Sequence, residues 1–394
     1  MAAPMPGDSR PRRLAKPGDV AIPFVRAREF LDQRAPGSDH PGELPIARPT
    51  IAVARQVFHD ELVLLGMRMF MPVGEHGAVE RVDREVTEAL EFYGERGWLD
   101  DPAGYFTGPP ALTGVAAAPM TIRGQALQRI IFDSGYQPHT GEPGAQRWQG
   151  YTANRREHAL LLRHHQPRPW VVCVHGAMMG RGSVDLRLFR ARHLHEDLGL
   201  NVVLPVLPLH GPRKNKGAAF PGQDLLDDVH AAAQAVWDIR RLISWIRTQE
   251  PGAKIGLNGM SLGGYVSSLV ASVEDGLTCA VLGVPVADLI AVLGGHGGLR
   301  DDDPRKHTLQ RALPLGRMVS PLSLTPKVPM RGRFIYGGLA DRLVNPRDQV
   351  LRLWEHWGKP EVHWYAGAHT GFFRSRPVQN FVDTALLQSG LFDE

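Results

Sequence analysis

The stretch between residues 253 and 272, AKIGLNGMSLGGYVSSLVAS, constrains the fold of this chain more than any other. Its first part, residues 254–258, is a short apolar run with β character. Residues 259–263 (GMSLG) then match the G-x-S-x-G pattern, and apolar residues recur at helical spacing after it: Tyr265, Val266, Leu269 and Val270. A strand, a sharp turn and a helix in this order predict a nucleophile elbow. The alternative is a glycine-flanked serine in an ordinary strand–helix turn.

The elbow interpretation gives each residue of the pattern a physical task. The turn would hold Ser261 in strained backbone geometry at the carboxyl edge of a sheet. Side chains at Gly259 and Gly263 would collide with the strand or the helix, so glycine is expected at both positions. The backbone N–H of Leu262 would then point to the place where an oxyanion forms.

Strand-like and helix-like segments alternate from about residue 126 onward. We expect helices at 184–198, 225–246, 346–357 and 377–388, and eight strands at 128–136, 158–165, 170–174, 201–207, 254–258, 277–286, 333–336 and 361–365. The run WVVCV at 170–174 is typical of a central strand that is buried on both faces. The alternation predicts an α/β fold, with a mostly parallel eight-stranded sheet, helices on both faces and one antiparallel edge strand.

The residues before this alternation look different. Residues 1–50 are rich in proline and in mixed charge, which favours a flexible N-terminal arm. Residues 51–125 are expected to form a helical extension, with helices at 51–71 and 80–97 and a Gly/Pro-rich connection at 98–125. The helix at 51–71 could pack on the main domain or on a second subunit; interior packing is favoured, and a homo-oligomer through the N-terminal helices stays an open alternative.

Composition excludes several classes of protein. The 45 Lys and Arg residues nearly balance the 41 Asp and Glu residues, and no basic stripe with interleaved aromatics occurs, so no nucleic-acid partner is expected. Residues 102–122 are uncharged but carry four prolines and three glycines, so no stable membrane insertion is expected either. The N-terminus has no apolar signal region, and Cys173 and Cys279 are expected to be buried free thiols. These features favour a cytoplasmic protein.

One acidic residue and one basic residue complete the predicted chemistry of Ser261. Asp341 follows the expected strand 333–336, and His369 follows the expected strand 361–365. Loops at the carboxyl ends of parallel strands converge on one crevice. A serine hydroxyl needs a base, and that base needs an orienting acid, so the order Ser, Asp, His fits an elbow-type hydrolase.

A second turn supplies the expected partner of Leu262 in the oxyanion hole. The strand 170–174 runs directly into a His175-Gly176 turn, which would bring the N–H of Ala177 beside that of Leu262. His175 itself is interpreted first as a structural hydrogen-bonding residue. No H-E-x-x-H motif, Cys/His cluster or phosphate-binding loop occurs, so neither a metal nor another cofactor is expected.

Taken together, GMSLGG, VVCVHGAMMG, YGGLADRLV and YAGAHTGFF resemble the motifs of the α/β-hydrolase superfamily over roughly residues 126–390. The resemblance implies Ser261 as nucleophile, Asp341 as acid and His369 as base, with the hydrolase domain at 126–394. Some members of the superfamily place the acid earlier, so Asp288 is an alternative. The N-terminal extension resembles that of some abhydrolase-domain proteins.

Other residues are candidates for contact with the substrate. His175, Met178, His210 and Arg213 lie near the expected crevice, and Arg213 could hold an acidic group; the simpler interpretation of His210 is a turn histidine. Residues 289–330 resemble a lid insertion, in which Leu289–Leu293, Leu313, Leu315 and Met318 would face an acyl chain. An ordinary surface excursion is the alternative.

The sequence therefore predicts a serine hydrolase that cleaves a carboxylic ester or thioester of a small acyl substrate. The intermediate would be an acyl-enzyme on Ser261. Lipase, peptidase and acyltransferase activities would use the same three residues and remain alternatives. A non-catalytic binding or scaffold protein with this fold is a further alternative from a different class.

Overall fold

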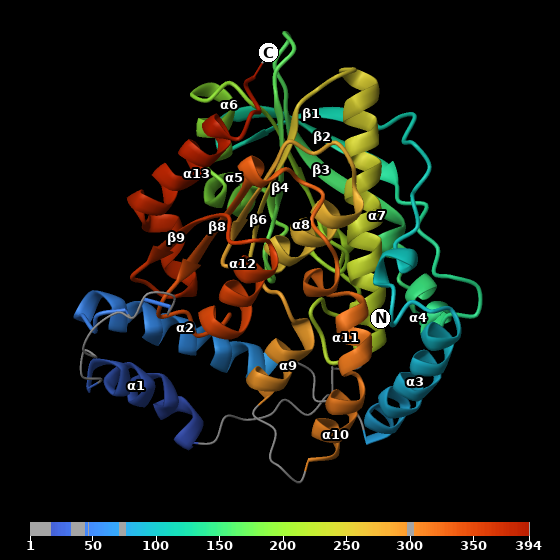
Figure 1. Cartoon of the computed structure of the whole chain (residues 1–394), viewed down its shortest axis with the longest axis vertical. Coiled ribbons are helices and arrows are strands. Elements are labelled where there is room, and N and C mark those ends of the chain that lie inside the picture. The colour runs from blue at the N-terminus through green and yellow to red at the C-terminus, as the bar shows by residue number, and fades with distance from the viewer. Residues whose placement is uncertain (1–16, 33–43, 46, 71–75, 298–302, 394) are drawn as a thin grey trace, which may run out of the picture.

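The computed structural model describes residues 17–32, 44–45, 47–70, 76–297 and 303–393 (Figure 1). Nine strands of these residues form one sheet in the order β1-β2-β3-β5-β4-β6-β7-β8-β9. Their bounds are β1 Ala116–Ile122, β2 Gln125–Asp133, β3 Arg156–Leu162, β4 Trp170–Val174, β5 Asn201–Pro205, β6 Ile255–Met260, β7 Cys279–Gly283, β8 Arg333–Gly338 and β9 Glu361–Tyr365. The strands from β5 to β9 pair in parallel, whereas β1 with β2, β2 with β3, and β3 with β5 pair antiparallel.

The predicted α/β architecture with a mostly parallel sheet is confirmed, but the sheet has nine strands instead of eight. The additional strand β1 falls within residues 98–125, which were expected to be a connection. Its sequence AAAPMTI contains small residues and Pro119, and its residues are mostly exposed at the edge of the sheet. An edge strand of this kind has no alternating hydrophobic pattern to detect. The sheet therefore begins about ten residues before the predicted boundary at 126.

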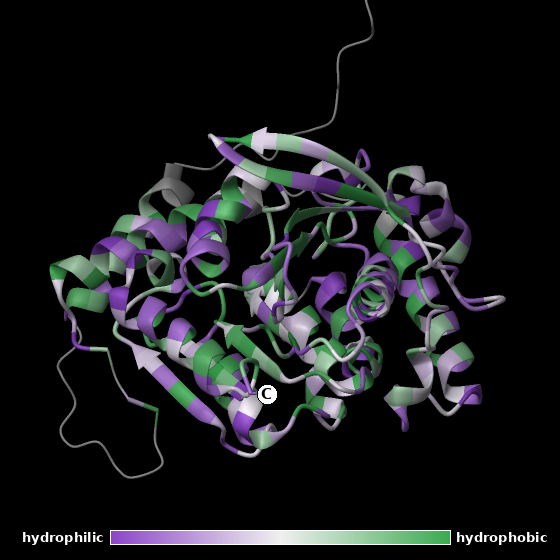
Figure 2. Cartoon of the chain, turned by 90° about the horizontal axis from the view of Figure 1, so that it is seen from above, coloured by the Kyte–Doolittle hydropathy of each residue, from purple (hydrophilic) through white to green (hydrophobic). Residues whose placement is uncertain are grey.

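Helices cover both faces of the sheet, as the alternating side chains of β4 show. Trp170, Val172 and Val174 belong to the hydrophobic core formed with α7 (Leu225–Gln249) and α8 (Leu262–Val273). Val171 and Cys173 belong to the core on the opposite face, beneath α6 (Ala191–Glu196) and α13 (Arg376–Gln388). Figure 2 shows the strands in the interior as mostly hydrophobic and the surrounding helices as mixed. Both cysteines are buried free thiols, as predicted.

The helices after β4 and β8 differ in detail from the prediction. Instead of one helix at 184–198, the structure has α5 (Gly182–Leu188) and α6, separated at Arg190, whose φ is 52°. At this break the Arg190 guanidinium binds the carboxylate of Asp383 on α13. The segment predicted as a helix at 346–357 begins with a π-helical turn, Pro346–Leu351, before α12 (Arg352–His356).

The N-terminal residues contain more helix than expected. Residues 17–32 form α1 (Pro17–Asp32), which packs on α2 (Ile51–Phe70), so the prediction of a flexible arm at 1–50 is wrong there. The rest of that arm lies outside the described residues, apart from 44–45 and 47–50. Helices α2 and α3 (His76–Glu95) match the two predicted helices. Val53 and Val57 of α2 are buried against Ala340 and Ala368, so α2 packs on the main domain.

The segment 289–330 carries three helices: α9 (Leu289–Gly297), α10 (Pro304–Arg311) and α11 (Leu313–Met318). Leu289, Ile290, Leu315 and Met318 were expected to face an acyl chain, but they are buried in the core beneath α7 and α8, and Leu313 is exposed. The prediction for these residues is therefore wrong. Figure 1 shows α1, α2, α9 and α10 gathered at one end of the sheet.

Two further properties concern the described residues alone. None of their helices is both long and apolar enough to cross a lipid bilayer. No group of three or more His, Cys, Asp or Glu side chains among them is arranged to hold a metal ion.

Candidate active site

Ser261 lies in the sharp turn between β6 and α8. Its φ is 56° and its ψ is −119°, a strained conformation for a residue other than glycine. The two flanking glycines explain how the turn fits. A side chain at Gly263 would overlap the carbonyl of Val174, and one at Gly259 would overlap the carbonyl of Gly263. The Ser261 N–H donates to the carbonyl of Gly283 at 2.8 Å, which holds the turn against β7.

The imidazole of His369 lies between the Ser261 hydroxyl and the Asp341 carboxylate. Its Nε2 is 3.0 Å from Ser261 Oγ, and its Nδ1 is 2.7 Å from Asp341 Oδ2. The other carboxylate oxygen of Asp341 accepts the N–H groups of Leu343 at 2.9 Å and Val344 at 2.7 Å. The carboxylate is thus fixed by its own loop, so Nδ1–H donates to Asp341 and Nε2 is left to accept the serine proton.

The charge state of His369 follows from its surroundings. Burial by itself lowers its pKa, but the carboxylate of Asp341, through charge and hydrogen bonding, and the charge of Asp60 together raise the pKa above its usual value. The site therefore favours a positive charge on the imidazole. A base that must hold a proton during a reaction benefits from this arrangement.

Asp288, the alternative acid, lies elsewhere. Its Oδ1 accepts the N–H of Ala291 at 3.0 Å at the start of α9, and its Oδ2 is 3.6 Å from Arg352. Asp341 is the carboxylate that reaches His369. Of the two acids considered from the sequence, the structure brings only Asp341 to the imidazole.

The His175-Gly176 turn lies against Ser261, as expected. A Cβ atom at Gly176 would be 3.4 Å from the Cβ of Ser261. Leu262 is the first residue of α8, so its N–H has no acceptor within the helix. Ala177 is partly exposed beside this turn, and Met178 is 63% exposed with a φ of 62°. Ala177 and Leu262 therefore lie on the two turns that meet at Ser261, and Met178 is exposed at the surface beside them.

His175 and His210 are not available to a substrate in the way expected. His175 is buried, donates through Nδ1 to the carbonyl of Gly176 and accepts the N–H of Leu207 at Nε2, 3.0 Å away. Burial lowers its pKa to about 3. His210 is also buried and donates through Nδ1 to the carbonyl of Pro208, and burial lowers its pKa to about 4. Both are neutral structural histidines.

The predicted role of Arg213 in substrate binding is wrong. Its side chain is fully buried and forms ion pairs with the carboxylates of Glu157 and Asp238, the latter at 2.7 Å. It also donates to the carbonyls of Val206 and Asn154. Because the guanidinium is fully buried among these partners, a substrate group cannot reach it.

Sequence reasoning missed Asp60 of α2. Its carboxylate is fully buried and accepts the backbone N–H of His369 at 2.8 Å and that of Arg342 at 3.2 Å. A signal for it exists in the sequence: Val53, Val57, Asp60 and Leu64 follow one another at helical spacing and are all buried, so a carboxylate stands on the apolar stripe of the helix. A charged residue at such a position needs a partner.

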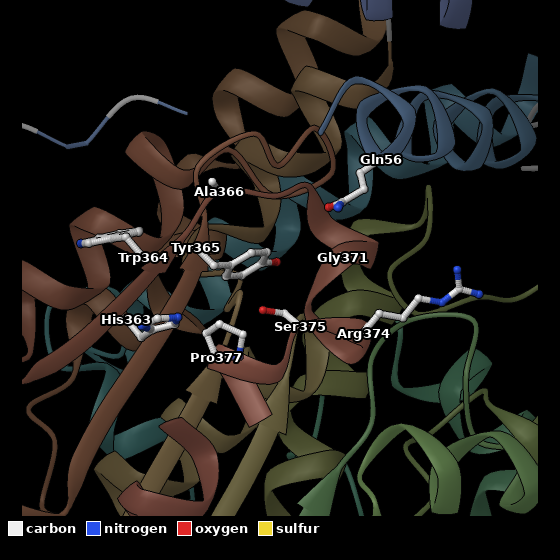
Figure 3. A pocket seen from close by; sticks show the side chains of 9 residues that line it. All are labelled: Gln56, His363, Trp364, Tyr365, Ala366, Gly371, Arg374, Ser375 and Pro377. Atoms are coloured by element: carbon white, nitrogen blue, oxygen red, sulfur yellow. The ribbon is translucent and has the colours of Figure 1, made fainter. Parts of the chain in front are cut away.

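A pocket of about 440 Å³ lies between α2, the end of β9 and the segment that leads into α13 (Figure 3). Its lining comes from α2, from β9 and from the turn before α13: Gln56, His363, Trp364, Tyr365, Ala366, Gly371, Arg374, Ser375 and Pro377. Ser261, Asp341 and His369 are absent from this lining. The pocket is therefore separate from the space beside the serine.

Comparison with known proteins agrees with this architecture. A family model described as "Alpha/beta hydrolase domain containing 18" matches residues 153–286. Uncharacterized proteins of Mycobacterium tuberculosis strains CDC 1551 / Oshkosh and ATCC 25618 / H37Rv are each 64% identical over 369 residues, which is 93% of this chain and 88% of theirs. The structure is also similar to acetyl xylan esterase 1 from Thermoanaerobacterium sp. JW/SL YS485, with a TM-score of 0.51 and 16% identity over 76% of this chain and 93% of that one. This last likeness concerns the fold alone.

Proposed function

This chain belongs to the α/β-hydrolase family, which supports a hydrolase, and we propose that it is a serine hydrolase cleaving carboxylic esters or thioesters through an acyl-enzyme on Ser261. One observation carries the proposal: the unbroken chain of hydrogen bonds from Ser261 Oγ through His369 to Asp341, at a strained turn. The expected substrate is a small acyl compound.

In the proposed acylation step, Ser261 Oγ attacks the carbonyl carbon of the substrate. The hydroxyl proton moves to His369 Nε2, and the carbonyl oxygen becomes an oxyanion that the N–H groups of Leu262 and Ala177 stabilise. The tetrahedral intermediate then collapses. The leaving alcohol or thiol takes the proton from Nε2, and Ser261 keeps the acyl group.

Deacylation repeats these steps with water. His369 Nε2 takes a proton from the water molecule, whose oxygen attacks the acyl carbon, and the proton then returns to Ser261 Oγ as the acid leaves. Asp341 keeps its negative charge throughout, holds Nδ1 in the protonated tautomer and stabilises the imidazolium.

A scaffold protein with this fold is the competing proposal, and the geometry at Ser261 argues against it. A strained backbone conformation costs about 1–3 kcal/mol and persists where function uses it. A buried Asp–His pair aimed at a serine adds a further cost of desolvation. A non-catalytic protein gains nothing from either feature.

Hydrolysis of p-nitrophenyl acetate, butyrate and octanoate tests the proposal, with an acyl-thioester and p-nitroanilide counterparts alongside. We expect turnover of the esters, with an initial burst of nitrophenolate equal to the enzyme concentration wherever deacylation is slower than acylation. Faster turnover of the anilides would replace the esterase proposal with a peptidase. No turnover of any of these substrates, together with no acyl adduct on Ser261 by mass spectrometry, would contradict it.

A further inference from the structure

Helix α2 lies outside the predicted hydrolase domain, yet it contacts both segments that carry the proposed acid and base. We propose that Asp60 is a positioning residue of this site: it holds the two segments together, and its charge favours the imidazolium of His369. This inference rests on the proposed function of Ser261, Asp341 and His369.

The contacts of Asp60 connect the two segments directly. Its Oδ2 accepts the N–H of His369 at 2.8 Å and the N–H of Arg342, next to Asp341, at 3.2 Å. Its Oδ1 accepts the N–H of Thr370 at 3.2 Å and the Thr370 hydroxyl at 3.1 Å. One carboxylate thus fixes the backbone on either side of the Asp341–His369 hydrogen bond.

Neighbouring side chains of α2 extend this attachment. The Gln56 carboxamide oxygen accepts the N–H of Ala368 at 3.1 Å, and Glu61 accepts the Arg342 guanidinium at 3.0 Å. A side chain at Gly371 would overlap the Gln56 carboxamide, so the helix and the segment with His369 are in close contact. Gln56 is visible above this segment in Figure 3.

Packing alone does not explain a carboxylate at this position. Burying a charged group is costly unless hydrogen bonds compensate, and an apolar residue would serve helix packing better. Each of the four donors to Asp60 belongs to residues 342, 369 or 370, on the two segments that carry the proposed acid and base. The cost of burial is therefore offset only through contacts at the proposed site.

The charge of Asp60 acts on His369 together with a small set of groups. Asp341 hydrogen-bonds the ring, and Ser261 lies at its other nitrogen; Arg342 is paired with Glu61, and His59 contacts Thr370 at the exposed surface. The Tyr365 hydroxyl donates to the carbonyl of Ala368, and burial raises its pKa, so it is neutral.

The pKa of Asp60 is itself raised. Burial and the charge of Asp341 raise it, and His369 opposes this shift. A positive charge on His369 therefore favours the ionised form of Asp60, and an ionised Asp60 favours that positive charge. The two effects are reciprocal, as linkage requires.

Asp60→Asn in the full chain tests the inference, because it removes the charge and one acceptor oxygen while keeping the shape. With the nitrophenyl ester that the wild type cleaves best, we expect kcat to fall about 10- to 100-fold. A fall of this size corresponds to the loss of one charged hydrogen-bond acceptor. KM should stay within about twofold, because Asp60 does not touch the substrate. The midpoint of the acid limb of kcat/KM against pH should move to lower pH.

Asp288→Asn is the matched control. It removes one negative charge at the same edge of the sheet without touching His369, and it should leave kcat and the midpoint unchanged. Thr370→Val is a milder second variant that removes one donor to Asp60; we expect a fall of about threefold in kcat and a shift of the midpoint in the same direction. Rates are normalised to the fraction of protein that a fluorophosphonate titrates.

The outcomes separate the two proposals. Suppose that the wild type is active. If Asp60→Asn then leaves the midpoint of the pH profile unmoved, whether kcat is unchanged or lowered, the inference is overturned and the proposed function stays intact. If Asp60→Asn does not fold, an unmoved midpoint in Thr370→Val overturns it instead. A wild type that neither hydrolyses esters nor reacts at Ser261 would overturn both.

Discussion

Two buried clusters of charged residues in this molecule differ in whether their basic group reaches a partly exposed residue. The edge cluster comprises Asp60, Asp341 and His369, and the inner cluster comprises Glu157, Arg213 and Asp238. In the inner cluster every member is at most 2% exposed, and the guanidinium is surrounded by two carboxylates and two carbonyls. In the edge cluster one ring nitrogen is directed at the hydroxyl of Ser261, which is partly exposed.

In the two clusters, burial serves two different purposes, stability and proton transfer. In the inner cluster, burial raises the pKa of Glu157, and the charge of Arg213 opposes that shift and favours the ionised carboxylate. The cluster joins β3, the turn after β5 and α7, and it has no outlet to a ligand. Both clusters hold two carboxylates around one basic group, but in the edge cluster that group is an imidazole, and the charges of Asp341 and Asp60 raise its pKa. The first arrangement is suited to stability and the second to proton transfer.

Ser261→Ala is expected to have the largest effect of the variants that separate the two clusters. If the edge cluster serves proton transfer, the loss of the nucleophile should lower kcat by about 10⁶-fold and leave folding unchanged. Ester turnover and thermal unfolding of the same preparation measure both quantities. Turnover near that of the wild type would show that the serine is not the nucleophile.

Asp341→Asn tests the acid within the edge cluster. The amide cannot hold the correct tautomer of His369, so we expect kcat to fall about 10⁴-fold with little change in KM. Steady-state kinetics of this variant beside Asp288→Asn measure the effect. The opposite ranking of the two variants would assign the acid to Asp288.

Arg213→Met tests the inner cluster. Removing the cation leaves two buried carboxylates without an opposite charge, although Ser134 and Val206 still donate to them, and we expect a loss of about 3–5 kcal/mol in the free energy of unfolding. Denaturant unfolding measures it, with the exposed neighbour variant Lys214→Met as the control. KM of the folded fraction should not change. A stable variant with a strongly raised KM would restore Arg213 as a substrate ligand.

The smallest expected effect is a shift in the pH dependence of kcat/KM of the wild type. His369 must be neutral to accept the serine proton, and its surroundings raise its pKa above the usual value of about 6.5. The value of kcat/KM should therefore rise with pH to a plateau, with a midpoint above pH 6.5. A midpoint below that of a free histidine would contradict the charge assigned to the edge cluster.

The parts of the fold that sequence could predict are those with local signals. The elbow around Ser261, the loops with Asp341 and His369, and the long helix α7 each carry their pattern within about 25 residues. The edge strand β1 carries no pattern, because its residues are small and exposed. At the break, Arg190 pairs with Asp383, which is 193 residues away along the chain, so no local pattern indicates this contact.

The errors at the candidate site have the same origin. The position of Arg213 after a strand predicts a place near the crevice, but its ion pairs with Glu157 and Asp238, which other elements supply, hold it in the interior. Asp60 is 309 residues from His369, and only tertiary packing brings them together. The one local signal for Asp60 is its position on an otherwise apolar helical stripe. This position indicates that the carboxylate has a partner but not which residue that partner is.

Covalent labelling of the purified wild-type chain with a fluorophosphonate tests the central claim most directly. We expect one adduct per chain, located on Ser261 by peptide mapping, abolished in Ser261→Ala and strongly slowed in His369→Ala. A folded wild-type protein that gains no adduct, or gains one at another residue, would contradict it.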